Sequence, residues 1–197
     1  MEHSLTTRGL KIRYLQKGKG IPVVLLHGFS FNAETWVEIG LFDELAREYS
    51  VYSFDMPYGA KSRSDKFSAE TMDEYAGVLN DILKTLNIQK PTLLGASISG
   101  EIALRYFIRG YSACAGIVVG PVNLNNLDVH LSRITVPLLA IWGERDMISL
   151  PADSKLLESH VKDAEVHIIK GAGHPCYLDE PEKFREMVKD FLKRYTA

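Results

Sequence analysis

Short apolar runs alternate along this chain with longer segments of helical period. A segment of alternating polar and apolar residues at 4–16, with a turn near Arg8-Gly9, predicts a hairpin. The short runs that follow have the length of strands, and those at 22–26, 92–96 and 116–119 have the continuity of buried strands. They lie at 22–26, 51–54, 92–96, 116–119, 138–142 and 164–169.

Between these runs, apolar residues recur with the period of amphipathic helices. Ser68 is the expected N-cap of the second helix, and Pro181 stands in the first turn of the last one. Helices are expected at 35–49, 68–86, 98–109, 151–159 and 181–195. This alternation predicts an α/β fold, a mostly parallel eight-stranded sheet with helices on both faces.

Composition and charge narrow the class of protein. The 197 residues, 46% of them hydrophobic and 24% charged, suit a single globular domain over 1–197. Because 23 Lys and Arg balance 25 Asp and Glu without a long basic cluster, nucleic-acid binding is not expected. The longest apolar stretches, 21–26 and 113–122, are shorter than the roughly 20 residues that cross a bilayer. With no membrane span and no apolar signal core in the charged N-terminus, a cytoplasmic protein is expected.

The cysteines and glycines indicate neither a cofactor nor a metal. Cys114 and Cys176 are too few for a disulfide framework and lack metal-ligand spacing, so free thiols are expected. The first buried strand is not followed by G-x-G-x-x-G. Cys176 lacks a nucleophile's turn and a second partner, which favours a packing role over a redox or nucleophilic one.

The strongest chemical signal is the run 95–100, Gly-Ala-Ser-Ile-Ser-Gly, between an apolar strand and a helix. A serine on such a turn is exposed at the top of a sheet when small residues flank it two positions away. Gly95 and Ser99 flank Ser97, so a serine replaces one glycine of G-x-S-x-G. Ser99 is a rival nucleophile, but Glu101 is too bulky to flank the same turn around it. A plain helix cap is the alternative interpretation of Ser97.

Two further candidate residues, an aspartate and a histidine, each follow a predicted strand. With Ser97 they stand in the chain order serine, aspartate, histidine. Asp146 comes after the strand at 138–142, and His174 after the strand at 164–169. Carboxyl ends of parallel strands meet at one edge of a sheet, where open α/β sheets place their sites. A neutral serine needs an imidazole to accept its proton and a carboxylate to hold the imidazole's tautomer. Either residue alone could be an ordinary loop side chain, but together with Ser97 they predict a catalytic triad.

An oxyanion-binding loop is predicted directly after the strand at 22–26. Acyl transfer needs N–H groups aimed at the developing oxyanion, and those of Phe29 and Ile98 are expected to serve. His27 should hydrogen-bond within this loop rather than act as a second base. Core or surface packing is an equal alternative for the other side chains near the expected substrate pocket. The substrate-binding candidates are His27, Gly28, Phe31, Tyr58, Met147 and Ile148.

With these residues in this order, the chain resembles the α/β-hydrolase superfamily over essentially its whole length. A narrower similarity, to the small CIB-type hydrolases (the fourteenth type of α/β-hydrolase-domain protein), rests on three runs. They are Glu34-Thr35-Trp36, Ser97-Ile98-Ser99-Gly100 and the run 171–179, Gly-Ala-Gly-His-Pro-Cys-Tyr-Leu-Asp. The resemblance implies a capless serine hydrolase of small acyl compounds, with Ser97, Asp146 and His174 in the triad positions.

The chain departs from these families in two motifs and in length. Of the superfamily's D-x-P-G-x-G-x-S pattern, Asp55, Pro57 and Ser62 match but the glycines do not. Gly95-Ala96 stands where a CIB-type elbow has Ser-Pro. Many superfamily members carry a helical lid after the sixth strand, whereas here residues 120–137 are all that separate two strands. An open site that holds long or bulky substrates poorly is therefore expected.

Three functions remain compatible with these residues. In the first, a serine esterase, Ser97 forms an acyl-enzyme from a small-molecule acyl substrate and water resolves it. In the second, the same triad passes the acyl group to another acceptor, or takes it from an amide. In the third, a binding module merely retains the fold. Dehalogenase and epoxide hydrolase chemistry would need a carboxylate in place of Ser97.

Overall fold

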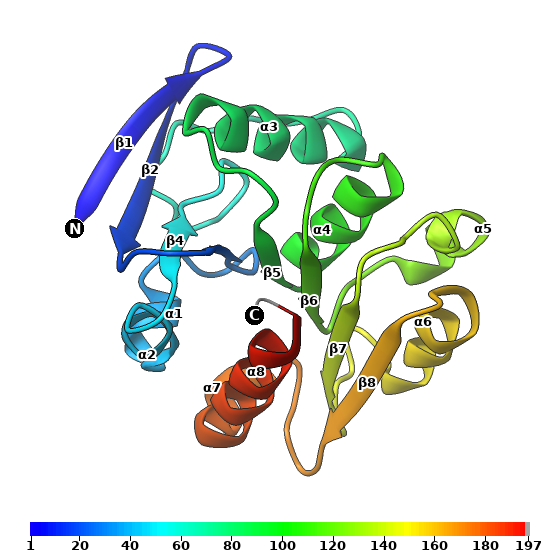
Figure 1. The fold of residues 1–197 in the computed structure, drawn as a ribbon. Coiled ribbons are helices and arrows are strands. Elements are labelled where there is room, and N and C mark those ends of the chain that lie inside the picture. Colours follow the sequence, from blue (N-terminus) through cyan, green and yellow to red (C-terminus); the bar gives the residue numbers. More distant parts are fainter. Residues whose placement is uncertain (196–197) are drawn as a thin grey trace.

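The computed structural model describes residues 1–195 and contains an eight-stranded sheet (Figure 1). The strands are β1 (Glu2–Thr7), β2 (Leu10–Lys17), β3 (Pro22–Leu26), β4 (Ser50–Phe54), β5 (Thr92–Ala96), β6 (Ala115–Val119), β7 (Leu138–Gly143) and β8 (Ala164–Ile169). Their order across the sheet is β1-β2-β4-β3-β5-β6-β7-β8. Strand β2 runs antiparallel to β1 and β4, and all other neighbours are parallel. The predicted fold class is confirmed.

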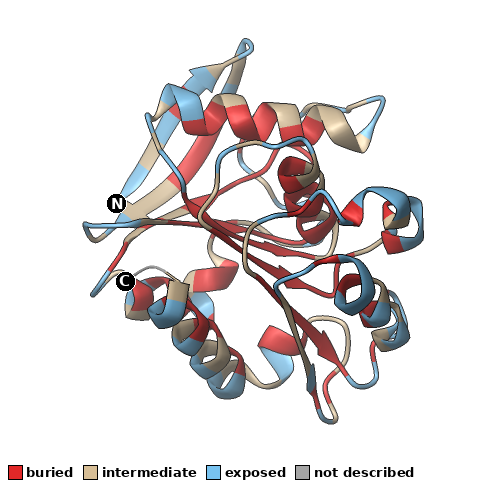
Figure 2. Ribbon diagram, turned by 45° about the vertical axis from the view of Figure 1, so that its right-hand side comes forward, coloured by how far each residue is buried: buried red, intermediate tan, exposed pale blue. Residues whose placement is uncertain are grey.

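Helices cover both faces of this sheet. They are α1 (Thr35–Glu38), α2 (Leu41–Leu45), α3 (Met72–Thr85), α4 (Ile98–Ile108), α5 (Asp128–Leu131), α6 (Ser154–His160), α7 (Cys176–Asp179) and α8 (Pro181–Tyr195). Helices α3 to α6 contribute to the apolar core on one face, and α1, α2, α7 and α8 to the core on the other. Figure 2 shows the result, with buried residues along the sheet and on the inner sides of the helices. The central strands β5, β6 and β7 are buried at every position, as their continuous apolar runs predict.

Three of the predicted helices differ in the structure. The one expected at 151–159 is a 3-10 turn over Pro151–Asp153 followed by α6. The segment 35–49 forms two short helices instead of one, because Gly40 adopts a left-handed conformation with φ of 77° between them. Helix α3 begins at Met72, after the N-cap residue Thr71, and not at Ser68. The chain before it folds back on the helix, since the Tyr75 hydroxyl donates to the carbonyl of Phe67 at 2.9 Å. Helices α5 and α7 were not predicted.

The segment between β6 and β7 holds a short 3-10 turn, η1 (Leu124–Asn126), and helix α5. Residues 120–137 therefore contain no inserted cap domain, as their number predicts. Within residues 1–195, no helix is both long enough and apolar enough to cross a membrane. The carboxyl edge of the sheet is thus bordered by loops, and the candidate site lies among them.

Candidate active site

Ser97 occupies the sharp turn between β5 and α4. Its φ of 55° and ψ of −117° lie in a region that residues other than glycine seldom adopt. The turn is held by a hydrogen bond of 2.8 Å from the Ser97 N–H to the carbonyl of Val119 in β6. Position 95 must be glycine, since a Cβ there would stand 2.3 Å from the carbonyl oxygen of Ser99. The close approach of β5 to α4 therefore explains why the motif has its smallest residue on this side of the serine.

Ser99, which replaces the second glycine of the motif, is a buried structural residue. Its hydroxyl donates to the carbonyl oxygen of His27 and is also hydrogen-bonded to the Tyr58 hydroxyl. Because the Ser99 proton goes to the carbonyl, the Tyr58 hydroxyl donates to Ser99. These bonds join the first turn of α4 to the β3 loop, which we define as residues 27–34. The same bonds engage the hydroxyl oxygen of Ser99, which was the alternative candidate for the nucleophile.

His174 lies between Ser97 and Asp146. Its Nε2 is 2.9 Å from Ser97 Oγ, and its Nδ1 is 2.7 Å from Asp146 Oδ2. The other carboxylate oxygen, Oδ1, accepts hydrogen bonds from the N–H groups of Ile148 at 2.8 Å and Ser149 at 2.9 Å. An ionised carboxylate only accepts, so Nδ1 of His174 carries the proton and the Nε2 lone pair faces the Ser97 hydroxyl. The structure thus brings the three predicted residues together in one hydrogen-bonded line.

Two residues that the sequence analysis did not single out support this line. Gly120, with φ of 48°, lies beside the His174–Asp146 pair, where a Cβ would stand 3.0 Å from Asp146 Oδ2. Ser149 accepts a hydrogen bond from Trp142 Nε1 at 2.9 Å and donates one to the carbonyl of Pro121 at 2.7 Å. The only signal for Gly120 in the sequence is its place directly after a buried strand at the sheet's carboxyl edge.

His27 is a structural member of the β3 loop. The Met56 N–H donates to His27 Nε2 at 2.9 Å, so Nδ1 carries the ring proton and donates to the Gly28 carbonyl at 2.8 Å. Burial of the ring lowers its pKa and keeps it neutral. Both ring nitrogens are thereby occupied within the protein, which matches the expectation that His27 shapes the loop.

We expect His27 to make the protein less stable in acid. Its ordinary pKa of 6.5 is lowered by folding, so below that pH the unfolded chain binds a proton that the folded protein does not. The full contribution to stability is present above this pKa and is lost as the pH falls below it. Denaturant unfolding at about pH 7 and pH 5 should show a smaller fall for His27→Gln than for the wild type. Equal falls in both proteins would contradict this assignment.

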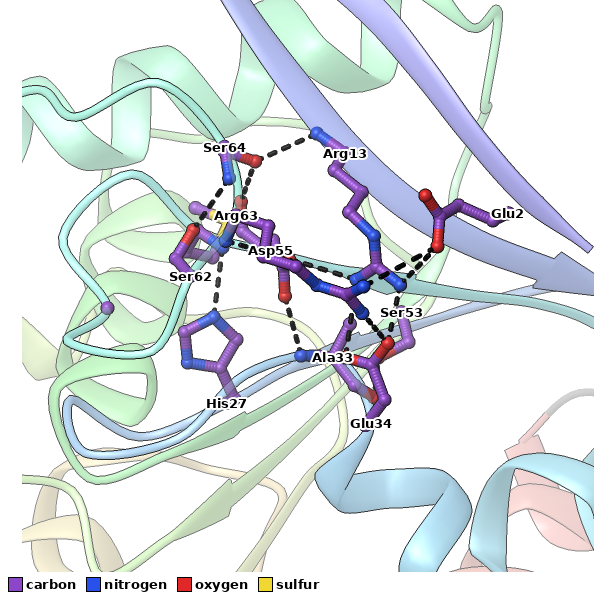
Figure 3. A network of polar contacts seen from close by, with 12 residues as sticks. Glu2, Arg13, His27, Ala33, Glu34, Ser53, Asp55, Ser62, Arg63 and Ser64 are labelled. Atoms are coloured by element: carbon purple, nitrogen blue, oxygen red, sulfur yellow. Dashed lines mark hydrogen bonds and ion pairs between the residues drawn. The ribbon is translucent and has the colours of Figure 1, made fainter.

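A buried charged network fastens the far end of the β3 loop (Figure 3). Asp55, which is fully buried, accepts the Ala33 N–H at 2.7 Å and a guanidinium N–H of Arg13 at 2.9 Å. Arg13 also pairs with Glu34 at the end of the loop. The Ser53 hydroxyl donates to the Ala33 carbonyl at 2.9 Å, so both backbone groups of Ala33 are bound. The aspartate that matches the superfamily pattern therefore positions this loop.

The two predicted oxyanion donors have free N–H groups. Among the residues that the structure describes, the N–H of Phe29 has no acceptor. Ile98 opens α4, where the first N–H groups have no intrahelical acceptor. Gly28 brings the β3 loop against the turn that holds Ser97, because a Cβ on Gly28 would stand 3.6 Å from Ser97 Cβ. Backbone donors from two segments therefore border Ser97.

A cleft of about 220 Å³ opens beside Ser97. Its lining confirms neither Tyr58 nor Met147 as a pocket residue: the Tyr58 ring is buried with its hydroxyl on Ser99, and the Met147 side chain is 83% exposed. His27 also lies outside the lining, in its structural role. Ser30, Val119 and Tyr177 are lining residues that the sequence analysis missed. The full lining is Gly28, Phe29, Ser30, Phe31, Ser97, Val119, Ile148, His174 and Tyr177.

Cys176, the cysteine near His174 in sequence, is a buried and protonated thiol. Cys176 is fully buried, and burial raises its pKa to about 12, so the thiol stays protonated near neutral pH. This burial agrees with the packing interpretation of Cys176. In the part of the chain that the structure describes, no three His, Cys, Asp or Glu side chains are grouped to hold a metal ion.

Comparison with known proteins identifies the family of the chain. Residues 21–120 match the family model of the alpha/beta hydrolase fold. Human ABHD14A is 32% identical over 181 residues, which are 90% of this chain and 66% of that protein, just under two thirds. The human protein called "Putative protein-lysine deacylase ABHD14B" is 30% identical over 175 residues, which are 87% of this chain and 82% of that protein.

A solved structure shows the same fold. The crystal structure of a "predicted CIB-like hydrolase" from Thermoplasma acidophilum has a TM-score of 0.92 at 24% identity, with 98% of each chain covered. The chain therefore belongs to the α/β-hydrolase fold family of hydrolases. Within that family it is an ABHD14-like protein, which confirms the narrower resemblance found in its sequence.

Proposed function

We propose that this protein is a serine hydrolase that cleaves small acyl esters through an acyl-Ser97 intermediate. The observation that carries the proposal is the hydrogen-bonded line from Ser97 Oγ through His174 to Asp146, with distances of 2.9 and 2.7 Å. His174 takes the hydroxyl proton as Ser97 Oγ bonds to the acyl carbon, and returns that proton to the leaving alcohol. A water molecule then attacks the acyl carbon with His174 again as base, which frees Ser97 and the acid. Asp146 holds the imidazole and stabilises the imidazolium.

In this mechanism the N–H groups of Phe29 and Ile98 bind the oxyanion of each tetrahedral intermediate. Backbone donors fixed in place before the reaction need no reorganisation as negative charge develops. The bonds from Ser99 to the His27 carbonyl and from the Ala33 N–H to Asp55 support this assignment, since they fix the β3 loop relative to the turn at Ser97.

The size of the cleft favours short acyl groups. Its volume of about 220 Å³ is smaller than the roughly 300 to 1,000 Å³ of sites for drug-sized ligands, and residues 120–137 contain no cap that would add further walls. We expect p-nitrophenyl acetate and butyrate to be cleaved with a higher kcat/KM than esters with chains beyond about eight carbons. A spectrophotometric chain-length series measures this preference. A maximum at the long chains would contradict the small-cleft interpretation.

A fluorophosphonate probe tests the proposed function directly. Attack by the activated serine joins its oxygen to phosphorus and releases fluoride, so the intact mass rises by one adduct. Labelling of the wild type that is lost in Ser97→Ala is the expected result. If the folded wild type takes up no probe, the protein is a binding module with a hydrolase fold and the proposal fails.

A second candidate, removal of an acyl group from a lysine amide, is favoured by the name of the ABHD14B relative. The same acyl-Ser97 intermediate would form, with His174 protonating the leaving amine. Ester and amide substrates with the same acyl group distinguish the two functions. An acetyl-lysine peptide with a higher kcat/KM than alkyl acetates would make the deacylase the principal activity.

A further inference from the structure

Tyr177 is a residue of the cleft wall that the proposed mechanism does not use. Tyr177, in α7, lines the cleft together with Ser97 and His174 and is 3% exposed. No hydrogen bond from a described residue reaches its hydroxyl, yet the oxygen keeps contact with solvent. A hydroxyl that has no protein partner and is open to solvent is available to a bound molecule. In a residue that lines the cleft, such a hydroxyl is one of the few polar groups that can orient a small ligand.

Aromatic neighbours hold the Tyr177 ring in place. The ring centroid lies 5.0 Å from that of Trp36, 5.8 Å from that of Phe184 and 6.2 Å, edge to face, from that of Phe31. Such a packed ring has a fixed orientation, and its hydroxyl cannot turn to a different protein partner. A hydroxyl held this way is ready for a ligand at little cost in conformational entropy.

The chemistry around this hydroxyl limits what it can bind. Burial raises the pKa of Tyr177, so the phenol keeps its proton and can donate as well as accept. Phe29, Phe31, Val119 and Ile148 make the rest of the wall largely apolar. Ligand sites combine such walls with a few polar groups that fix the ligand's orientation.

We propose that Tyr177 is a specificity-determining residue that selects small esters with a hydroxyl or keto oxygen close to the scissile carbonyl. This inference rests on the proposed esterase function. Binding of an ester without that oxygen displaces water from the Tyr177 hydroxyl and puts nothing in its place, which raises the barrier for that substrate. The oxygen can belong to the acyl group or to the alcohol, and matched substrates distinguish these two sources.

Isosteric ester pairs provide the test. On the acyl side, p-nitrophenyl lactate is compared with p-nitrophenyl isobutyrate, and p-nitrophenyl β-hydroxybutyrate with the isovalerate. On the alcohol side, hydroxyethyl acetate is compared with propyl acetate. In each pair a methyl group replaces the hydroxyl, so the ratio of the two kcat/KM values isolates the hydrogen bond.

For the wild type we expect the hydroxylated ester to be preferred in at least one pair. Tyr177→Phe should lower that preference roughly fivefold, the effect of one neutral hydrogen bond. Tyr106→Phe is the matched control, since its buried hydroxyl donates to the Ser112 carbonyl and Tyr106 does not line the cleft. The control should keep the wild-type ratios. No preference in any pair, or equal preferences in the wild type and Tyr177→Phe, would overturn the inference.

Binding to a Ser97→Ala background separates this inference from the proposed function. The same intact esters compete in ligand-observed NMR against Ser97→Ala and against the Ser97→Ala, Tyr177→Phe double variant, without turnover. A difference in Kd between pair members that is lost in the double variant supports the Tyr177 role even if catalysis fails. If the two members of every pair have equal Kd values in both variants, the Tyr177 inference is overturned. An absence of fluorophosphonate labelling in the wild type overturns only the proposed esterase function.

Discussion

Replacement of Ser97 by alanine should lower kcat for p-nitrophenyl butyrate by about 10⁴-fold to 10⁶-fold. The variant loses the hydroxyl oxygen that the lone pair of His174 Nε2 faces, at 2.9 Å, so no acyl-enzyme can form. The residual rate would come from water acting beside the intact backbone donors. Steady-state assays with purified protein, and a burst experiment to detect the acyl-enzyme, measure the loss.

Ser99→Ala is the matched control for this substitution. It removes the same hydroxyl two residues further on, where the oxygen bonds to the His27 carbonyl and to Tyr58. This variant should still react with a fluorophosphonate, although a looser β3 loop can slow the reaction. If Ser99→Ala abolished labelling while Ser97→Ala retained it, the nucleophile would be Ser99 and the proposed mechanism would be wrong.

The centre of the sheet was predictable because its strands have continuous apolar runs. Strands β5, β6 and β7 are buried at every position, so each is visible as an uninterrupted apolar segment. The order of the site residues followed from the same pattern, since each lies just after a strand whose carboxyl end faces one edge. The ends of predicted strands therefore indicate which residues form the candidate site, even though the sequence gives no distances between their side chains.

Contacts between distant segments were not predictable in this way. The break between α1 and α2 depends on Gly40, where a Cβ would stand 2.5 Å from the guanidinium of Arg185 in α8. That guanidinium donates to the Ile39 carbonyl at 2.9 Å across 146 residues of sequence. An isolated glycine within an amphipathic segment carries no sign of such a partner, so a single helix was expected.

The same limit applies to the pocket. Tyr58 follows β4 and was expected in the pocket, but its ring is buried and its hydroxyl is hydrogen-bonded to the buried Ser99 hydroxyl. Tyr177 follows His174 by three residues, and its place in the cleft depends on α7, a short helix without a clear periodic signal. Side-chain direction at a loop is decided by tertiary partners, which explains why both assignments needed the structure.

Replacement of Asp146 by asparagine should lower kcat by about 10⁴-fold while the fold is kept. The N–H groups of Ile148 and Ser149 both point at Oδ1, so the amide oxygen of the substituted side chain would occupy that position. Its NH₂ group then faces His174 Nδ1 and donates to it. Nδ1 must become the acceptor, which places the ring proton on Nε2, facing Ser97. An Nε2 that already carries a proton cannot take the one on the Ser97 hydroxyl.

The opposite amide orientation is unfavourable, because it would set the NH₂ group against two N–H donors in a fully buried position. Asp153→Asn, in the 3-10 turn η2 (Pro151–Asp153), removes an equal charge from the same loop region and should keep wild-type activity. Measurement of kcat for both variants near pH 7, with circular dichroism to verify folding, tests the argument. A fall of less than about tenfold for Asp146→Asn would show that Asp146 does not set the tautomer of His174, and the acidic member of the triad would then have to be sought elsewhere.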